Sequence, residues 1–192
     1  MNAKHSAAIA IVTLVIIVAL VASIATFVST SPASDVTYQE PTSAVRASTR
    51  QTATDGTIAL RLNGISDASN PATSSVWVEF SREALASGVY NFSLTPPQGD
   101  SYLIANITVT NVHHAAVSFS YAYFVLVSQN DAAYYANYAV CSGDCSAQAL
   151  KARTLNENFT SDLYVLFSVP AGTQPTKLVY TASSPPIVIT LI

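Results

Sequence analysis

A run of 22 residues without a charged side chain, Ala7–Val28, constrains this chain more than any other feature. As an α-helix it would be about 33 Å long, which matches the hydrocarbon core of a bilayer. A short segment with Lys4 precedes the run, and the first acidic residue after it is Asp35. Because the positive charge lies on the N-terminal side, we expect the rest of the chain to be exported, with the N-terminus inside.

Three fates of this segment stay open. A secretory peptidase can cut after Ala25, because Ser23 and Ala25 are small residues at the −3 and −1 positions of that site. Alternatively, Ala7–Val28 is retained as a transmembrane signal anchor. In the third alternative, Ala7–Val28 is the core helix of a type IV pilin-like filament. Lys4 and His5, however, match the cleavage site of such precursors poorly. Residues 1–28 are thus a signal peptide or a signal anchor.

Residues 29–55 have a different composition, with eleven Ser or Thr among 27 residues. Such a segment buries too little apolar surface to offset the entropy of ordering, so we expect a linker, which as a stalk would suit O-glycosylation. A second interpretation makes it a donor arm that adds a strand to a neighbouring subunit. The candidate inserted side chains are Val36, Tyr38, Val45 and Ala47.

From residue 56 to residue 192, short apolar runs alternate with polar residues at the period of a β-strand. Turn residues such as those at 96–100 separate the runs, and helix is expected only as one turn at Ser81–Ala86. Seven or eight strands predict one mainly-β domain, an antiparallel β-sandwich that follows the single N-terminal hydrophobic helix. The expected strands are Ile58–Leu62, Val76–Phe80, Tyr102–Thr110, Val117–Val127, Leu163–Val169, Lys177–Thr181 and Ile187–Ile192.

Four short motifs accompany these strands. Gly99–Asn111 ends in T-V-T-N, Phe124–Val127 reads F-x-L, Leu163–Gly172 contains F-x-V-P, and Leu178–Tyr180 reads L-x-Y. Together they resemble an uncharacterised immunoglobulin-like extracytoplasmic domain family of bacterial and archaeal surface proteins, except that Asp162 and Leu163 stand where that family usually has glycine. The resemblance covers residues 56–192 and implies an immunoglobulin-like sandwich without implying a reaction.

Low charge excludes several classes of function. Charged residues make up 10% of the chain, the net charge is −3, and there are three His and two Cys. The chain has no basic patch for nucleic acid, no phosphate loop and no Ser-His-Asp order. Adjacent His113 and His114 would point to opposite faces of a strand, so we interpret them as polar turn residues. We therefore expect no enzyme, no metal, no cofactor and no nucleic-acid partner.

Two cysteines, Cys141 and Cys145, enclose three residues. In an exported chain such a pair is expected to be oxidised to a disulfide that pins the tip of a hairpin loop. The alternatives are a redox pair or half of a metal site. Redox pairs usually enclose two residues, and a thiolate metal site needs four ligands.

Two further sets of residues suggest contacts with sugars. Asn91, Asn106 and Asn158 each begin an N-glycosylation sequon, and attached sugars would supply the solubility that charge does not. Asn106 lies on an expected strand, so it must face outward if it is modified. The tyrosines Tyr134, Tyr135 and Tyr138 form either an exposed aromatic patch for sugar binding or adhesion, or part of the hairpin packing.

These features indicate a non-enzymatic extracellular structural protein of the cell surface. The first hypothesis is a glycosylated subunit of a filament, a pilus or thread, that assembles by N-terminal strand donation; its design is similar to that of archaeal thread and bundling-pilus subunits. The alternative is a membrane-anchored monomer for ligand binding or envelope support, and the second alternative is the type IV pilin-like subunit. Expected partners are copies of itself or cell-envelope components, and the membrane if Ala7–Val28 is retained.

Overall fold

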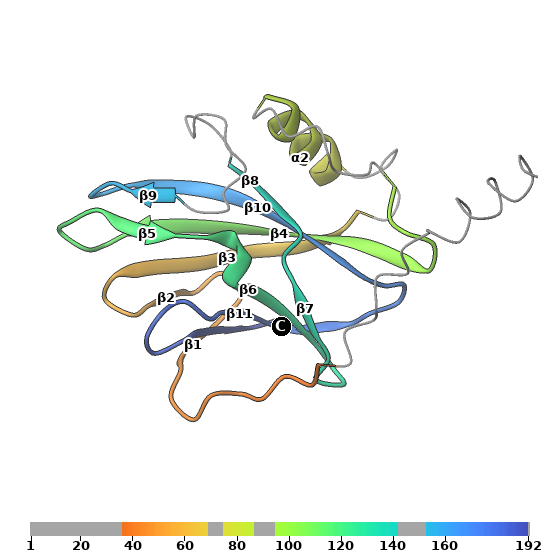
Figure 1. The fold of residues 1–192 in the computed structure, drawn as a ribbon, viewed down its shortest axis with the longest axis horizontal. Coiled ribbons are helices and arrows are strands. Elements are labelled where there is room, and N and C mark those ends of the chain that lie inside the picture. The colour runs from red at the N-terminus through yellow and green to blue at the C-terminus, as the bar shows by residue number, and fades with distance from the viewer. Residues whose placement is uncertain (1–35, 69–74, 87–94, 142–152, 192) are drawn as a thin grey trace, which may run out of the picture. The chain divides into compact units, whose positions relative to one another are not determined.

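The computed structural model describes residues 36–68, 75–86, 95–141 and 153–191, which fold into two stacked five-stranded sheets (Figure 1). Sheet A contains, in spatial order, β1 (Val45–Ser48), β12 (Ile187–Thr190), β11 (Pro175–Tyr180), β6 (Phe124–Ser128) and β7 (Ala133–Tyr135). Sheet B contains β2 (Thr52–Thr54), β3 (Ile58–Asp67), β4 (Asp100–Asn111), β10 (Thr160–Pro170) and β8 (Tyr138–Cys141). The short strands β5 (Val117–Phe119) and β9 (Arg153–Leu155) pair with each other, and the 3-10 helix η1 (Tyr121–Tyr123) leads into β6.

The core lies between the facing sides of the two sheets. On β4 and β10, which pair antiparallel over the whole length of β10, alternate side chains point inward, as the period-two pattern predicts. At one end of this core the Phe119 and Tyr180 rings stack 5.4 Å apart, and burial raises the pKa of Tyr180 to about 12. A mainly-β sandwich is thus confirmed. Its largest fully buried side chains include Leu60, Leu62, Ile107, Phe124, Leu126, Leu163 and Phe167.

The number of strands and the start of the domain differ from the sequence-based expectation. The described residues contain twelve strands rather than seven or eight. Two of them, β1 and β2, lie in the Ser/Thr-rich segment that was expected to be a linker. Such a segment can form them because a strand of three or four residues needs few apolar side chains. The sandwich therefore begins well before residue 56. Ala7–Val28 lies outside the described residues, and within them no helix is long and apolar enough to cross a membrane.

The segment Val76–Phe80, expected as a strand, is part of helix α2 (Ser75–Ala86). Trp77, Phe80 and Ala84 are three and four residues apart, so they share one face of the helix. This face packs on the outer side of sheet B, where the Trp77 ring stacks on Tyr102 at 5.5 Å and on Phe80 at 5.8 Å. Tertiary packing of this stripe outweighs the strand preference of the neighbouring valines.

Residues 36–48, here called the N-terminal strap, cross the outer face of sheet A (Figure 1). At one edge Thr37 forms a bridge with Ala132 beside β7, and at the other edge β1 pairs in parallel with β12. Between the two edges, Tyr38 and Ala44 pack against the outward valines of sheet A, Val125, Val127, Val179 and Val188. Both sheets therefore have their outer apolar side chains covered by elements of the same chain.

An ion-pair cluster fastens the strap at its middle. Glu40 accepts hydrogen bonds from Lys177 Nζ at 2.6 Å and from Arg46 Nη2 at 2.7 Å. The Lys177 hydrogen bond and then the Arg46 hydrogen bond lower the pKa of Glu40 below its usual 4.5. Because the folded-state pKa is the lower one, these ion pairs stabilise the strap fully above pH 4.5 and lose their effect as the pH falls through the lowered value.

Replacing Glu40 by Gln is expected to speed tryptic cleavage after Arg46 several-fold at neutral pH, because the strap loses both ion pairs. Since the cluster is exposed, the midpoint of global unfolding should stay nearly unchanged. Acidifying the wild type through the Glu40 pKa should loosen the strap in the same way. The control is Glu157→Gln at an exposed turn. Equal cleavage rates for Glu40→Gln and the wild type would contradict the account.

Asn111, which ends both β4 and the Gly99–Asn111 motif, is 1% exposed. Its Nδ2 donates to the carbonyl oxygens of Ala115, Leu155 and Asn156, each at 2.9 Å. Its Oδ1 accepts from the backbone N–H of His113 at 2.9 Å. The Asn111 side-chain amide therefore ties the β4–β5 turn to the β9–β10 turn. Its role is to stabilise the fold rather than to bind a ligand or react.

Candidate functional site

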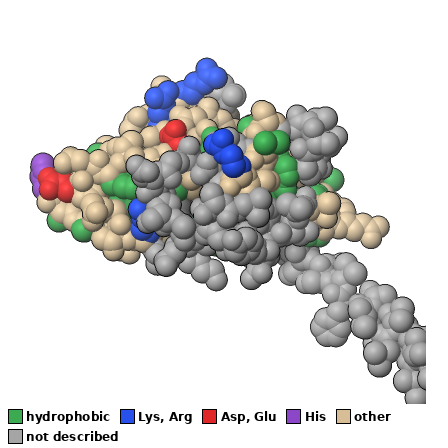
Figure 2. All heavy atoms as spheres, turned by 90° about the horizontal axis from the view of Figure 1, so that it is seen from above, with side chains coloured by type: hydrophobic (Ala, Val, Ile, Leu, Met, Phe, Trp, Pro, Cys, Tyr) green, Lys and Arg blue, Asp and Glu red, His purple; other side chains and the backbone are tan. Residues whose placement is uncertain are grey.

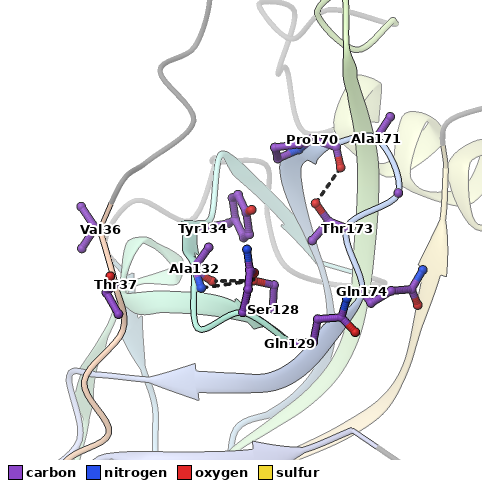
Figure 3. A pocket seen from close by; sticks show the side chains of 12 residues that line it. Val36, Thr37, Ser128, Gln129, Ala132, Tyr134, Pro170, Ala171, Thr173 and Gln174 are labelled. Atoms are coloured by element: carbon purple, nitrogen blue, oxygen red, sulfur yellow. Dashed lines mark hydrogen bonds between the residues drawn. The ribbon is translucent and has the colours of Figure 1, made fainter.

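A hollow of about 580 Å³, here called the end pocket, lies at one end of the sandwich (Figure 3). Its walls come from the β6–β7 turn, the β10–β11 turn and the start of the strap. The lining residues are Val36, Thr37, Ser128, Gln129, Asn130, Ala132, Tyr134, Pro170, Ala171, Gly172, Thr173 and Gln174.

Hydrogen bonds within and between the two turns fix the walls. Ser128 Oγ accepts from the backbone N–H of Ala132 at 3.2 Å, and Thr173 Oγ1 donates to the Pro170 carbonyl at 2.6 Å. Between the turns, the backbone N–H of Gln129 donates to the Gln174 carbonyl at 3.0 Å. Because these contacts use backbone groups and short side chains, the pocket is preformed. Asn130 Oδ1 accepts from Ser128 Oγ, so of the three amides only those of Gln129 and Gln174 remain available within the described residues.

The end pocket has an apolar side and a polar rim. Tyr134 is partly buried against the inter-sheet core, and in Figure 3 its ring lies between the strap and the turn that contains Pro170. Exposed amides from both turns, those of Gln129, Asn130 and Gln174, form the rim. Apart from the Tyr134 phenol, no lining side chain ionises. Such a lining offers hydrogen bonds to a neutral polar ligand and contains no Asp, Glu, His, Lys or Arg side chain.

A second hollow, of about 760 Å³, adjoins the end pocket and shares Thr173 and Gln174 with it. It contains two charged residues, Arg50 and Asp67. Arg50 has a φ of 68°, a conformation that is uncommon outside glycine, and its backbone N–H donates to the Leu62 carbonyl at 2.8 Å. The two hollows together extend across this end of the sandwich.

The three tyrosines predicted as one exposed patch have three different environments. Tyr134 lines the end pocket, whereas Tyr135 is 55% exposed at the edge of sheet A. Tyr138 lies on β8 and packs against the cluster formed by α2 and sheet B. Consecutive strand residues point to opposite faces, so Tyr134 and Tyr135 diverge, and the structure does not bring the three together.

The four donor-strand candidates are bound within their own chain. Val45 and Ala47 lie on β1 and pack against the inter-sheet core, while Tyr38 covers the outer face of sheet A. Val36 is 51% exposed and lines the end pocket.

The predicted covalent sites are partly within the described residues. Cys141 is disulfide-bonded, and its Sγ lies 2.9 Å from Ser161 Oγ; Cys145, its predicted partner, is outside the described residues. Asn158 is exposed in the β9–β10 turn, and Asn91 is outside the described residues. Asn106 points to the outer face of sheet B, where its Oδ1 accepts from Asn63 Nδ2 at 3.0 Å.

The adjacent histidines are exposed in the β4–β5 turn, as the turn interpretation predicted. His114 Nδ1 lies 3.5 Å from Glu157 Oε1, and Figure 2 shows histidine and acidic side chains together at one tip of the molecule. Within the residues that the structure describes, no group of three or more His, Cys, Asp or Glu side chains is placed to hold a metal ion.

Sequence reasoning missed most of the end pocket. Its polar rim comes from two turns that are far apart in the sequence, at 128–132 and 170–174. The available signals were Gly172, which has a φ of 82°, and the run of polar residues 128–131 that ends in Asp131 with a φ of 59°. These signals mark turns, but nothing in the sequence shows that the two turns touch.

The chain belongs to the family described as "Domain of unknown function (DUF4352)", whose match covers residues 65–187. Among solved structures, it is similar to an uncharacterised β-sandwich protein from Clostridium difficile, with 8% identity, a TM-score of 0.49, and coverage of 80% of this chain and 97% of that one. It is also similar to the yjhA protein from Bacillus subtilis, with 14% identity, a TM-score of 0.47, and coverage of 76% and 99%. No curated protein matches the chain.

Proposed function

We propose that this chain is a non-enzymatic, exported cell-surface protein whose immunoglobulin-like sandwich is held at the membrane by Ala7–Val28. One observation favours a self-contained surface domain over a subunit that needs a neighbour. The N-terminal strap completes its own sandwich, because β1 pairs with β12 and places Val45 and Ala47 against the core. A strand that is already bound in its own chain is not available to a neighbour unless it first detaches.

The end pocket and the surface of the domain support a non-enzymatic role at the cell surface. The end pocket is lined by apolar, hydroxyl and amide groups with one phenol and no charged side chain, which suits binding rather than catalysis. Charged residues are scarce in the whole chain, and few appear on the face drawn in Figure 2. Sugars on the sequons at Asn106 and Asn158 would keep such a surface soluble outside the cell.

The strap also shortens the expected linker. Residues from 36 onward belong to the sandwich, so only residues 29–35 remain between the apolar run and the folded domain. Seven extended residues span at most about 25 Å. A retained anchor would therefore carry the sandwich on a short tether rather than on a long Ser/Thr-rich stalk.

The experiment is N-terminal sequencing and intact mass of the native protein from the membrane fraction. The proposal predicts a start at residue 1 or 2, with added sugar mass if the sequons are used. A start at Thr26 in protein released from the membrane would contradict anchoring. A start at His5 or Ser6 would instead support the type IV pilin-like subunit.

Strand donation in a glycosylated filament, the design similar to archaeal thread and bundling-pilus subunits, is the second candidate. It is favoured by one feature of the strap: β1 has only four residues and occupies the edge of sheet A, so the same edge can accept β1 of another copy. Both arrangements use the same contacts. They differ only in which chain supplies the strap.

A disulfide between β1 and β12 separates these two candidates. Ser48 and Thr190 are register partners on the two strands, so a Ser48→Cys/Thr190→Cys chain is expected to form a cross-link. The monomeric surface domain predicts one band of single-chain size in a non-reducing gel of the cell surface. A ladder of multiples that collapses on reduction would favour strand donation. Each single variant alone is the control.

A further inference from the structure

We propose that the end pocket binds a neutral sugar unit of a glycan or polysaccharide. This goes beyond the surface placement proposed above, and it concerns the folded sandwich alone. Three properties of the pocket carry the inference: its charge, the kind of hydrogen-bonding groups on its rim, and its apolar side.

The charge of the lining excludes ionic ligands. None of the twelve lining residues is Asp, Glu, Lys, Arg or His. A phosphate, a nucleotide or an acidic peptide that entered would lose hydration without gaining a counter-charge, which is unfavourable. The pocket therefore fits a ligand that is polar and uncharged.

The rim matches hydroxyl groups. A primary amide offers two donors and an acceptor in one plane, and a sugar hydroxyl both donates and accepts, so one amide can bind two neighbouring hydroxyls. Gln129 and Gln174 are exposed and line the pocket from the β6–β7 turn and the β10–β11 turn. Neither side chain has a hydrogen-bond partner within the described part of the chain. A backbone hydrogen bond joins the two residues, so both side chains extend from fixed, neighbouring backbone positions.

The apolar side matches the carbon–hydrogen face of a pyranose ring. Tyr134 and Pro170 present apolar surface inside the pocket, and the Tyr134 ring is anchored by its contact with the inter-sheet core. The volume, about 580 Å³, falls within the usual range for small-molecule sites. Through the shared Thr173 and Gln174, a second unit of a longer chain can extend into the neighbouring hollow.

An extended peptide fits this end of the sandwich less well. Peptides that bind β-sheets usually add a strand to a free edge. Beside the pocket, the β7 edge is already occupied: Thr37 bridges to Ala132, and the backbone N–H of Ala133 donates to the Val36 carbonyl at 3.1 Å. The backbone groups of this edge are therefore already paired, and a ligand in the pocket would contact side chains instead.

The test is calorimetric titration of the purified full chain with three neutral probes: maltotetraose, mannotetraose and N-acetylchitotetraose. We expect at least one to bind with a Kd of about 1 mM or tighter. Gln129→Ala/Gln174→Ala should weaken that binding at least about tenfold, because both hydrogen-bonding amides are lost. The unfolding midpoint of this double variant should equal that of the wild type, because both glutamine side chains are exposed. The matched control is Asn156→Ala, an exposed residue in the turn at the other end of β10.

Three results would overturn the proposal. The first is no binding of any of the three probes at millimolar concentration. The second is binding that the double variant leaves unchanged, which would place the sugar elsewhere. The third is equal or tighter binding of the acidic probe tetragalacturonate, which would contradict the argument from charge. None of these outcomes depends on whether Ala7–Val28 anchors the chain, so the surface proposal is tested separately.

Discussion

Replacing Asn111 by Asp is expected to lower the free energy of unfolding by about 3 kcal/mol, because one buried and two partly buried carbonyl oxygens lose their donor at once. Asp has almost the same shape and keeps the acceptor for the His113 N–H. The carboxylate, however, would face the carbonyl oxygens of Ala115, Leu155 and Asn156. The measurement is urea unfolding of the variant and the wild type at neutral pH.

The pH dependence of the same variant gives an independent check. Burial among carbonyl oxygens raises the pKa of a carboxyl group, so Asp at position 111 should regain part of its stability as the pH falls and the protonated group donates again. The matched control is Asn156→Asp in the exposed β9–β10 turn, for which we expect no measurable change. If Asn111→Asp is no less stable than Asn156→Asp, Asn111 does not tie the two turns together.

Replacing Phe80 by Ala is expected to cost about 3 kcal/mol of stability, because a fully buried ring leaves a cavity between α2 and sheet B. Trp77 is the sole tryptophan of the chain, is 4% exposed, and stacks on Phe80. Its fluorescence therefore reports on this cluster. We expect the emission of the folded variant to shift to longer wavelength, because water gains access to the indole.

Substitution of the neighbouring Val78 tests whether residues 76–80 form a helix or a strand. In a strand, Val78 and Phe80 would share one face, whereas in α2 Val78 is 62% exposed and points away from the sheet. Val78→Ala should therefore leave both stability and tryptophan emission unchanged. A loss of stability comparable to that of Phe80→Ala would contradict the helix.

Sequence patterns predicted the long central strands well, because β4 and β10 have enough residues to show a clear alternation and each buries one face. They failed at 76–80, where Val76, Val78 and Phe80 imitate a strand while the stripe formed by Trp77, Phe80 and Ala84 directs a helix. Composition also misassigned the strap, since a segment rich in Ser and Thr can still be ordered by a few contacts with a preformed sheet.

The candidate site was less predictable than the fold. Tyr134 was predicted to belong either to an exposed aromatic patch or to the hairpin packing, but its grouping with Tyr135 and Tyr138 ignored the alternation of side chains on a strand. The amides of the rim became visible only when the structure brought the turns at 128–132 and 170–174 into contact. Long-range pairing of two turns leaves no periodic signal in a sequence.

Accessibility in intact cells tests the central claim, export to the cell surface, most directly. The change is Asn156→Cys, which places a thiol in an exposed turn. Intact cells are labelled with a maleimide that cannot cross membranes, and a cytoplasmic protein with a free cysteine is the control. The account predicts complete labelling of the variant in intact cells and none of the control. Labelling of the variant only after the cells are broken would place the sandwich inside the cell and contradict the account.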